Sequence, residues 1–463
     1  MQTHYDLIVV GGGPGGMAAA VSARRAGLSV LVTNEQGHLG GQIYHSIETT
    51  APDKARLLGK DYQYGKGLVS DFKACGADHL PQTLVASMEA GGNLSCVTPD
   101  GPVALEAGYT IVAAGAMERP VPIPGWTLPG VMGAASVDIL FKQSDVIPKG
   151  RVVFAGSGPL FLSVISHMID CGVEIAAILD TSSLKQVFPA LPHLPMALAQ
   201  PDLMVKGLAF QAKIKRARIP VIKGIEEIRA LGKDRLEGVQ YQRKGRTTEL
   251  AADLLLLHEG LIPNTQISRL LRCDHAWDAG QRYWKPVVDD WGQSSVPGTA
   301  FVGDCTGIAG AKAAEHAGHL AGLQAAHSLG FITREEREQK AAPHIRARIK
   351  NTRIRPFVEA LYPPNVRFTL PRDPNTVICR CEDVRLGEIQ AAMAKGCTTP
   401  VTLKNKTRAG MGRCQGRTCG PLVTEILAHA QNTSPEAIGY YKVRPLIKPL
   451  SLGELSRMDT PTQ

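Results

Sequence analysis

Four cysteines near the C-terminus are grouped as metal or cluster ligands are. They follow the pattern C-x-C, then 32 residues, then C-x4-C, and they are Cys379, Cys381, Cys414 and Cys419. Four thiolates can ligate a [2Fe–2S] cluster, whereas zinc sites of four cysteines usually have two to four residues within each pair. The segment 407–413 adds glycines, whose N–H groups can turn toward sulfur, and arginines, which can offset negative charge. The spacing favours iron–sulfur over zinc, and zinc over no metal.

A glycine-rich motif follows the first apolar stretch, 5–10, which we expect to be a buried strand. The sequence Gly11-Gly12-Gly13-Pro14-Gly15-Gly16 satisfies G-x-G-x-x-G and is followed by an expected helix. Gly11 permits the tight turn, Gly13 lets the backbone approach a pyrophosphate, and Gly16 lets the helix pack closely. The helix N-terminus offers free N–H groups to phosphates. This order predicts a dinucleotide site.

Two carboxylates bear on which dinucleotide binds there. Glu35 follows the second expected strand, 29–32, where a carboxylate accepts ribose hydroxyls, and its charge disfavours NADP. Asp304 follows the apolar strand 300–302 and precedes a helix rich in small residues. It can accept hydrogen bonds from a ribityl chain, which favours FAD, although an ordinary helix N-cap is the alternative.

A second motif of the same kind is incomplete. Gly156, Gly158 and Pro159 follow the strand 151–155, but Phe161 replaces the third glycine. Asp180 ends the next strand and can still accept ribose hydroxyls. Three alternatives stay open: NAD, a smaller adenine nucleotide such as ATP, or an empty site.

Composition bounds the remaining possibilities. The 463 residues carry a net charge of +9, of which +10 lies in residues 331–463 and −1 in the rest. We expect this basic region to face an acidic partner or to offset an anionic cluster, because it contains no recognisable nucleic-acid module. No apolar run approaches the length of a membrane span, and we see no signal peptide, so we expect a cytoplasmic protein.

Several motifs taken in order resemble the two-dinucleotide-domain flavoproteins, the class of thioredoxin and pyridine-nucleotide-disulfide reductases. They are Gly11–Gly16, Glu35, Gly40-Gly41-Gln42, Val112-Ala113-Ala114-Gly115 and Gly303-Asp304. The resemblance covers residues 1–330 and implies FAD near Gly41, Gln42, Ala114, Gly115 and Gly303. It departs from the reductases in one respect: residues 1–330 contain no two cysteines close in sequence. Disulfide reduction is therefore disfavoured.

The cysteine region resembles the bacterioferritin-associated-ferredoxin-like [2Fe–2S] domain. The matching residues are Cys379-x-Cys381-Glu382-Asp383, Ile389, Lys404, and Thr407 to Cys419 with Gln415 and Gly416. Together with the phrase 258–265 and the degenerate second motif, nearly the whole chain resembles the A (alpha) subunits of opine oxidases, hydrogen cyanide synthase and dye-linked proline or hydroxyproline dehydrogenases. That resemblance implies a separate FAD-containing beta subunit that oxidises the amine, and often a small ferredoxin-like gamma subunit.

We therefore expect an α/β fold with two Rossmann-like domains and a small C-terminal cluster domain. The expected boundaries are 1–120 with 245–330 for FAD, 121–244 for the second nucleotide domain, 331–375 for a linker extended from Arg346 to Pro374, and 376–463 for the cluster domain and tail. The expected role is electron relay to a quinone or dye, since no acid–base constellation is evident and no catalytic residue can be assigned. The alternatives are a stand-alone NAD(P)H-dependent reductase and a protein with silent cofactors.

Overall fold

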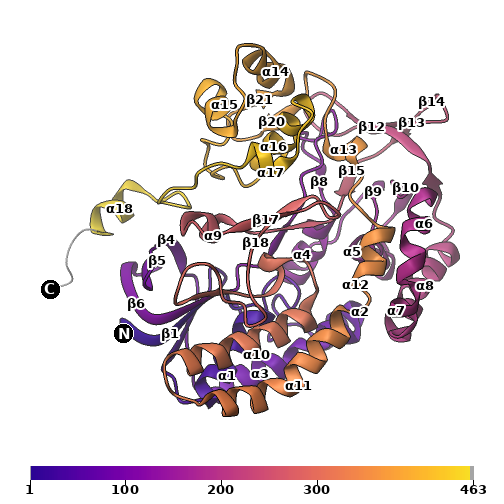
Figure 1. Cartoon of the computed structure of the whole chain (residues 1–463). Helices are drawn as coiled ribbons and strands as arrows, with labels where there is room; N and C mark the ends of the chain where they lie inside the picture. Colours follow the sequence, from indigo (N-terminus) through magenta and orange to yellow (C-terminus); the bar gives the residue numbers. More distant parts are fainter. Residues whose placement is uncertain (1, 459–463) are drawn as a thin grey trace.

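The computed structural model describes residues 2–458, and its first sheet has seven strands (Figure 1). The strand order is β3-β2-β1-β6-β5-β4, and β19 pairs with the C-terminal part of β6, beyond the part that pairs with β5. The strands beside β1 run parallel to it, whereas β4, β5 and β6 form an antiparallel meander. The bounds are β1 (His4–Val10), β2 (Val30–Thr33), β3 (Asp78–Leu80), β4 (Leu84–Met88), β5 (Asn93–Thr98), β6 (Gly101–Val112) and β19 (Thr299–Phe301).

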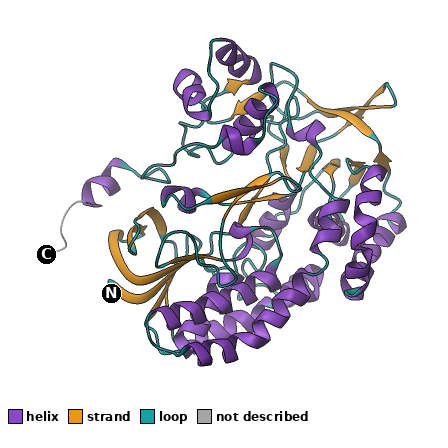
Figure 2. Ribbon diagram, in the orientation of Figure 1, coloured by secondary structure: helices purple, strands orange, loops and turns teal. Residues whose placement is uncertain are grey.

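A layer of helices covers one face of this sheet (Figure 2). Within it, α1 packs against α10, which in turn packs against α11. Small residues make this packing close: a Cβ at Gly318 would collide with the carbonyl oxygen of Gly15, and one at Gly322 with that of Ala19. The helices here are α1 (Pro14–Arg25), α2 (Pro52–Gln63), α3 (Gly65–Cys75), α10 (Ala311–Ser328) and α11 (Arg334–Thr352).

A second, parallel sheet of five strands has the order β11-β10-β9-β15-β8. It carries the second glycine motif, and a three-stranded antiparallel sheet adjoins it. The strands are β8 (Val131–Gly133), β9 (Val152–Gly156), β10 (Ile175–Asp180), β11 (Val221–Lys223) and β15 (Leu254–His258), then β12 (Ile225–Leu231), β13 (Gly238–Arg243) and β14 (Arg246–Ala251). The helices are α4 (Ala134–Ser144), α5 (Pro159–Asp170), α6 (Val187–Ala190), α7 (Leu194–Leu198) and α8 (Pro201–Arg216).

One expected boundary is wrong. A division at 244/245 places Leu254–Leu257 in the FAD domain, but β15 lies between β9 and β8, with Leu255 opposite Val153. Its apolar side chains complete the core of the second sheet, which needs strands buried on both faces. The chain returns to the first domain through β16 (Leu261–Pro263), which pairs with β7 (Ala116–Glu118).

The segment between the Rossmann-like domains and the cluster domain also differs from its prediction. An extended course from Arg346 to Pro374 is wrong, because α11 continues to Thr352 and is followed by α12 (Arg355–Leu361) and α13 (Val366–Thr369). Pro356 lies in the first turn of α12, where a helix needs no N–H donor. The segment is therefore compatible with helix despite its prolines.

The cluster module, residues 376–441, is a small unit with its own core, drawn in gold at the top of Figure 1. Its elements are β20 (Val377–Cys379), β21 (Val384–Arg385), α14 (Leu386–Ala394), α15 (Pro400–Thr407), α16 (Cys419–Ala430) and α17 (Pro435–Ile438). Beyond it the chain crosses back to the first sheet, where α18 (Leu452–Met458) contacts β6. Across residues 2–458, no helix is both long and apolar enough to traverse a bilayer.

Candidate functional site

One cavity of about 1030 Å³ brings together the motifs of three regions. Its wall includes the first glycine motif, the turn at Gly158–Pro159 of the second motif, and Arg413–Cys414 with Arg417–Thr418 of the cluster module. The expected residues Glu35, Gly41, Gln42, Ala114, Gly115, Gly303 and Asp304 also line it. This volume is at the upper end of small-molecule sites, as an extended dinucleotide requires.

The first motif forms an open cradle in this wall. Gly11 has φ +114°, and a Cβ there would lie 2.5 Å from the carbonyl oxygen of Ala113. A Cβ at Gly16 would collide with the Gly11 carbonyl, so the helix begins directly against the turn. At Gly13, by contrast, the nearest atom to a Cβ is 3.8 Å away, on Gly41. The open space at Gly13 fits a pyrophosphate next to the N-terminus of α1.

Glu35 projects from the end of the second strand. The side chain is 61% exposed and forms an ion pair with Lys448 of the C-terminal segment. Its neighbour Asn34 is buried and donates to the carbonyl oxygens of Gln36 (3.0 Å) and His38 (2.6 Å). Asn34 therefore shapes the loop, and Glu35 lies at the cavity wall, paired with Lys448.

Asp304 has a structural contact as well as a place in the cavity wall. Its Oδ1 accepts from the N–H of Ala309 (3.0 Å) and of Gly310 (3.2 Å), directly before α10. Burial raises the pKa of this carboxyl. The N-cap-like role and the flavin-facing role expected from sequence are thus compatible, since one oxygen holds the turn and the residue lines the cavity.

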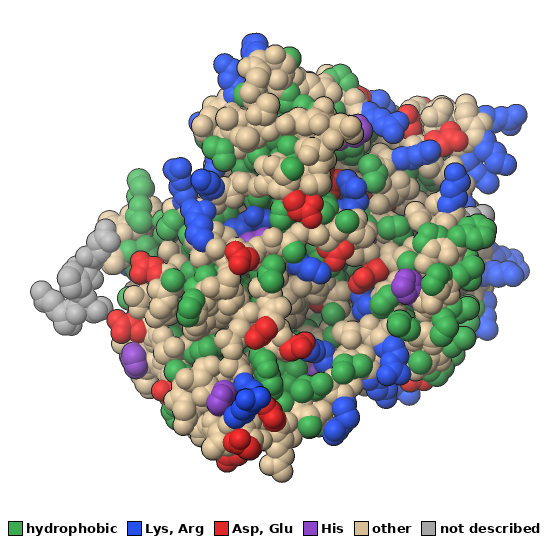
Figure 3. Space-filling view, viewed as in Figure 1, with side chains coloured by type: hydrophobic (Ala, Val, Ile, Leu, Met, Phe, Trp, Pro, Cys, Tyr) green, Lys and Arg blue, Asp and Glu red, His purple; other side chains and the backbone are tan. Residues whose placement is uncertain are grey.

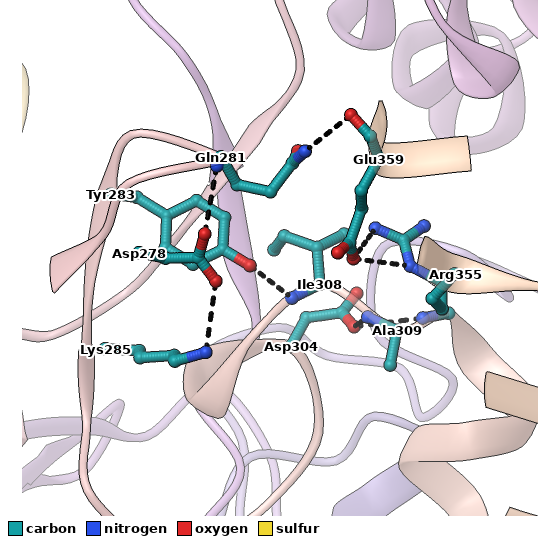
Figure 4. Close-up of polar contacts among 10 residues, drawn as sticks. Asp278, Gln281, Tyr283, Lys285, Asp304, Ile308, Ala309, Arg355 and Glu359 are labelled. Atoms are coloured by element: carbon teal, nitrogen blue, oxygen red, sulfur yellow. Dashed lines mark hydrogen bonds and ion pairs between the residues drawn. The ribbon is translucent and has the colours of Figure 1, made fainter. Parts of the chain in front are cut away.

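Helix α12 lies near the turn that contains Asp304 and Ala309 (Figure 4). Arg355 Nε donates to Glu359 Oε1 (3.0 Å), and Gln281 Nε2 donates to the Glu359 carbonyl oxygen (3.3 Å). Tyr283 Oη accepts from the N–H of Ile308 (3.2 Å). The bond from Gln281 attaches α12 to the segment that also carries Tyr283, and Tyr283 in turn holds the loop after Asp304. Arg355, Val358, Glu359 and Tyr362 form part of the cavity wall.

The second motif lies differently from the first. Phe161 is buried, with its ring stacked on His258 (6.2 Å between centroids) and edge-on to Phe154. Asp180 accepts from the N–H of Ser182 (2.9 Å) and lies 3.6 Å from Lys223. Of the described residues of this motif, Gly158 and Pro159 line the cavity, whereas Gly156 and Asp180 do not.

Residues after α12 are hydrogen-bonded to the strand ends of this second domain. The N–H of Asn365 donates to Glu259 Oε2 (2.8 Å), and its side-chain amide donates to the carbonyl oxygen of Thr181 (2.9 Å). Thr181 Oγ1 donates to Glu259 Oε1 (2.6 Å). Burial raises the pKa of Glu259 to about 7, against the opposing effect of these two donors. The carboxyl ends of parallel strands are where Rossmann-like domains bind dinucleotides, and here a protein segment lies there.

The four cysteines converge on one place in the cluster module. The Cys379 thiol contacts that of Cys419, and Cys381 contacts Cys414. The contact with Cys419, together with backbone N–H groups that include that of Gly410, lowers the pKa of Cys379 to about 6. A Cβ at Gly412 would collide with the Cβ of Cys381. Within residues 2–458 no three ligating side chains surround a single ion; two pairs of thiols with donors nearby fit a two-iron cluster.

The cluster module is docked on the flavoprotein body by specific polar contacts. Arg282 Nη2 pairs with the buried Glu425 carboxylate (2.6 Å). Trp126 Nε1 donates to the Val377 carbonyl oxygen (2.7 Å). The guanidinium of Arg269 lies 3.9 Å from the ring centroid of Tyr440. The module is therefore held at a defined position, with Cys414 at the cavity wall.

Sequence reasoning missed several residues of this site. Arg355, Glu359 and Tyr362 belong to a segment without a recognisable motif, and Lys448 lies beyond the cluster motif. Arg417 was inside the motif as an unspecified position, yet it lines the cavity and donates to the Cys414 carbonyl oxygen (3.1 Å). Only Arg417 had a signal, namely a cation between two ligating cysteines.

Comparison with protein families agrees with this architecture. Residues 5–318 match the pyridine nucleotide-disulphide oxidoreductase family, and residues 377–429 match the BFD-like [2Fe–2S] binding domain. Among solved structures, L-proline dehydrogenase from P. horikoshii has a TM-score of 0.69 at 19% identity, covering 98% of this chain and 79% of that chain. Thioredoxin reductase from T. acidophilum has a TM-score of 0.51 at 21% identity, covering 71% of this chain and 99% of that one. These likenesses show the fold.

Curated relatives match at higher identity and over almost the full length. The A subunit of opine oxidase from Rhizobium meliloti is 38% identical over 99% of this chain and 88% of its own length. The HcnB subunit of hydrogen cyanide synthase from Pseudomonas aeruginosa is 31% identical over 98% of both chains. The expected α/β fold and the expected family are confirmed. The chain belongs to the family of opine oxidase A subunits and HcnB, and it joins a pyridine nucleotide-disulphide oxidoreductase domain to a BFD-like [2Fe–2S] domain.

Proposed function

We propose that this chain is the electron-transfer subunit of a multi-subunit, FAD-dependent amine dehydrogenase or oxidase of the opine, proline or hydroxyproline type. It receives electrons from a separate FAD-containing beta subunit, which oxidises the amine, and delivers them to a quinone or dye. The observation that carries this proposal is the shared cavity, whose wall contains both the first glycine motif and Cys414. When bound, FAD supplies two-electron and a [2Fe–2S] cluster one-electron chemistry.

The chain's own residues have holding and positioning roles in this proposal. The cradle of Gly11, Gly13, Pro14, Gly15 and Gly16 holds the pyrophosphate of FAD, and Glu35 accepts from its ribose. Asp304 and the surrounding loops hold the flavin end. The cysteines 379, 381, 414 and 419 hold the cluster. The contacts of Arg282 and Trp126 keep the cluster module against the cavity, which suits electron transfer between fixed centres.

The contacts within the second domain argue against the alternative, a stand-alone NAD(P)H-dependent reductase. Phe161 fills the place of the third glycine, Asp180 is engaged with Ser182 and Lys223, and Asn365 is bonded at the strand ends. The segment around Asn365 occupies part of the strand ends at which a nicotinamide cofactor binds in such domains. Of the second motif, residues 157–160 line the cavity whereas Asp180 does not, and we propose that this domain serves mainly as scaffold.

A surface for a protein partner lies on the second domain. Helix α8 buries only Ile214 among its sixteen residues, and large apolar side chains are exposed around it as a green area at the right of Figure 3. The side chains concerned are Val187, Phe188, Leu191, Met196, Leu198, Leu203, Val205 and Leu208. Patches of this kind mark interaction sites. Because α6 and α7 contact α12, a beta subunit bound here would be close to the cavity wall; a small gamma subunit is a further proposed component.

An anaerobic reduction experiment separates relay from NAD(P)H oxidation. The purified chain with FAD and cluster is mixed with excess NADH or NADPH, and flavin absorbance near 450 nm is followed. We expect the flavin to stay oxidised for minutes and to be reduced once the beta subunit is supplied together with the amine. Reduction by NADH within seconds would contradict the proposal.

A further inference from the structure

The chain after the cluster module forms a strap, residues 442–458, across the first domain. Val443 and Ile447 are buried in the apolar core of the meander side of the first sheet. The N–H of Ile447 donates to the carbonyl oxygen of Ala86 (2.9 Å), and α18 contacts β6 at the end of the strap. The strap is thus anchored on both sides of residue 448.

Between these anchors, the strap closes one part of the cavity. Ile447, Lys448 and Pro449 line it, together with Gly12, Gly13 and Glu35 of the expected dinucleotide site. The Lys448 ammonium forms an ion pair with the Glu35 carboxylate, and it is 28% exposed. Glu35 occupies the position at which a Rossmann-like domain binds the adenosine ribose.

A second cation connects the strap to the cluster loop. Arg417 Nη2 donates to the Ile447 carbonyl oxygen (2.9 Å), and Nη1 donates to that of Cys414 (3.1 Å). Arg417 therefore ties the strap to the cluster loop at the residue next to Lys448.

We infer that Lys448 is a positioning residue for the adenosine half of the dinucleotide site. It holds the Glu35 side chain at the cavity, so that Glu35 can accept hydrogen bonds from the ribose hydroxyls, and the strap covers that end of the site. The inference rests on the proposed binding of FAD at the first motif. It gives the C-terminal segment a role in retaining the cofactor of the N-terminal domain.

Titration of the FAD-depleted full-length chain tests this, with iron content and melting temperature measured for each variant. Lys448→Ala should weaken FAD about 3-fold, because a partly exposed ion pair contributes roughly 0.2–1 kcal/mol. Lys448→Glu should weaken FAD about 10-fold, since it adds like-charge repulsion. Lys442→Glu, an exposed change on the same strap, is the matched control and should bind as the wild type does.

Two further arms locate the effect. In the Lys448 variants, the affinity for ADP should fall by the same factor as the affinity for FAD, because Lys448 lies at the adenosine half of the site. In a Glu35→Gln background the Lys448→Glu penalty should largely disappear, since the repelled charge is gone. FAD and ADP affinities equal to the control, or a penalty that persists in Glu35→Gln, would overturn the inference while leaving the proposed function intact. A wild-type chain that binds no FAD would overturn both.

Discussion

The two glycine motifs of this chain have different surroundings. At the first, glycine stands at all three motif positions, and Glu35, paired with Lys448, lies at the cavity wall. At the second, Phe161 is packed on His258, Asp180 is held by local contacts, and Asn365 is bonded to Thr181 at the strand ends. We propose that the same βαβ architecture serves as a cofactor cradle in one domain, whereas in the other its strand ends bind a segment of the protein itself.

The difference comes from few residues. A glycine at the third position lets a helix begin against its strand, whereas a buried aromatic ring requires space between them. Parallel strands flank the motif-bearing strand in both domains. Whether such a domain binds a ligand depends on the loops at the strand ends more than on the sheet itself.

Matched substitutions in the two motifs should have the largest and most different effects on FAD retention. Gly13→Val puts a branched side chain into the space for the pyrophosphate and should abolish FAD retention. Gly158→Val, where nothing lies within 4 Å of a Cβ, should leave FAD content unchanged, although its positive φ makes some loss of stability expected. Flavin-to-protein ratios after gel filtration report both, and unchanged flavin in Gly13→Val would refute the site assignment.

Removing the cluster should show that the first motif holds flavin without it. Cys414→Ser or Cys419→Ser removes one of four thiolates, so the brown colour and about two irons per chain should be lost. The flavin absorbance should remain, because the cradle lies in the first domain. Iron and zinc analysis checks the assignment; stoichiometric zinc without iron in the wild type would end the iron–sulfur interpretation.

Glu259, at a strand end of the second domain, should make the stability of the protein depend on pH. Its folded pKa of about 7 is above the ordinary 4.5, so the folded state binds the proton more tightly than the unfolded state. That contribution to stability is complete below pH 4.5 and is lost as pH rises through 7, by about 3 kcal/mol. Relative to Glu259→Gln, the wild type should lose about this much unfolding free energy between pH 4.5 and 8. If urea unfolding gave the same pH dependence of the unfolding free energy for the wild type and for Glu259→Gln, the buried environment proposed for Glu259 would be contradicted.

Asp304→Ala should weaken FAD binding without abolishing it, in contrast to Gly13→Val. One charge-assisted hydrogen bond contributes roughly 1.5–3 kcal/mol, so FAD should bind more weakly but still measurably. Asp304→Asn keeps an acceptor for the N–H groups of Ala309 and Gly310 and is the control for the turn. If the Asn variant lost as much affinity as the Ala variant with an unchanged melting temperature, the negative charge and not the turn would account for the effect.

Much of the fold followed from sequence because its signals are local. Expected strands at 5–10 and 175–179 and the helix 311–328 correspond to β1, β10 and α10, since apolar runs, glycine turns and small-residue helices have clear patterns. The strand at 254–257 was recognised, but its sheet was not. Strand order depends on contacts far apart in sequence, here between Leu255 and Val153.

The site was only partly predictable for a similar reason. The cysteines and the first motif have a defined spacing, so their residues could be named. Helix α12 and Lys448 reach the cavity through tertiary packing, and a proline-rich, basic segment indicated an extended course. Pro356 is compatible with a first helical turn, which composition alone does not distinguish from a linker.

The most direct test of the central claim is amine oxidation by the chain with and without its partner. The isolated chain, with FAD and cluster verified by absorbance and iron content, is assayed with opines, proline and hydroxyproline and a dye acceptor. The relay assignment predicts negligible turnover alone and restored turnover when the FAD-containing beta subunit is supplied. Turnover of any of these substrates by the isolated chain would contradict the assignment and would place the catalytic site here.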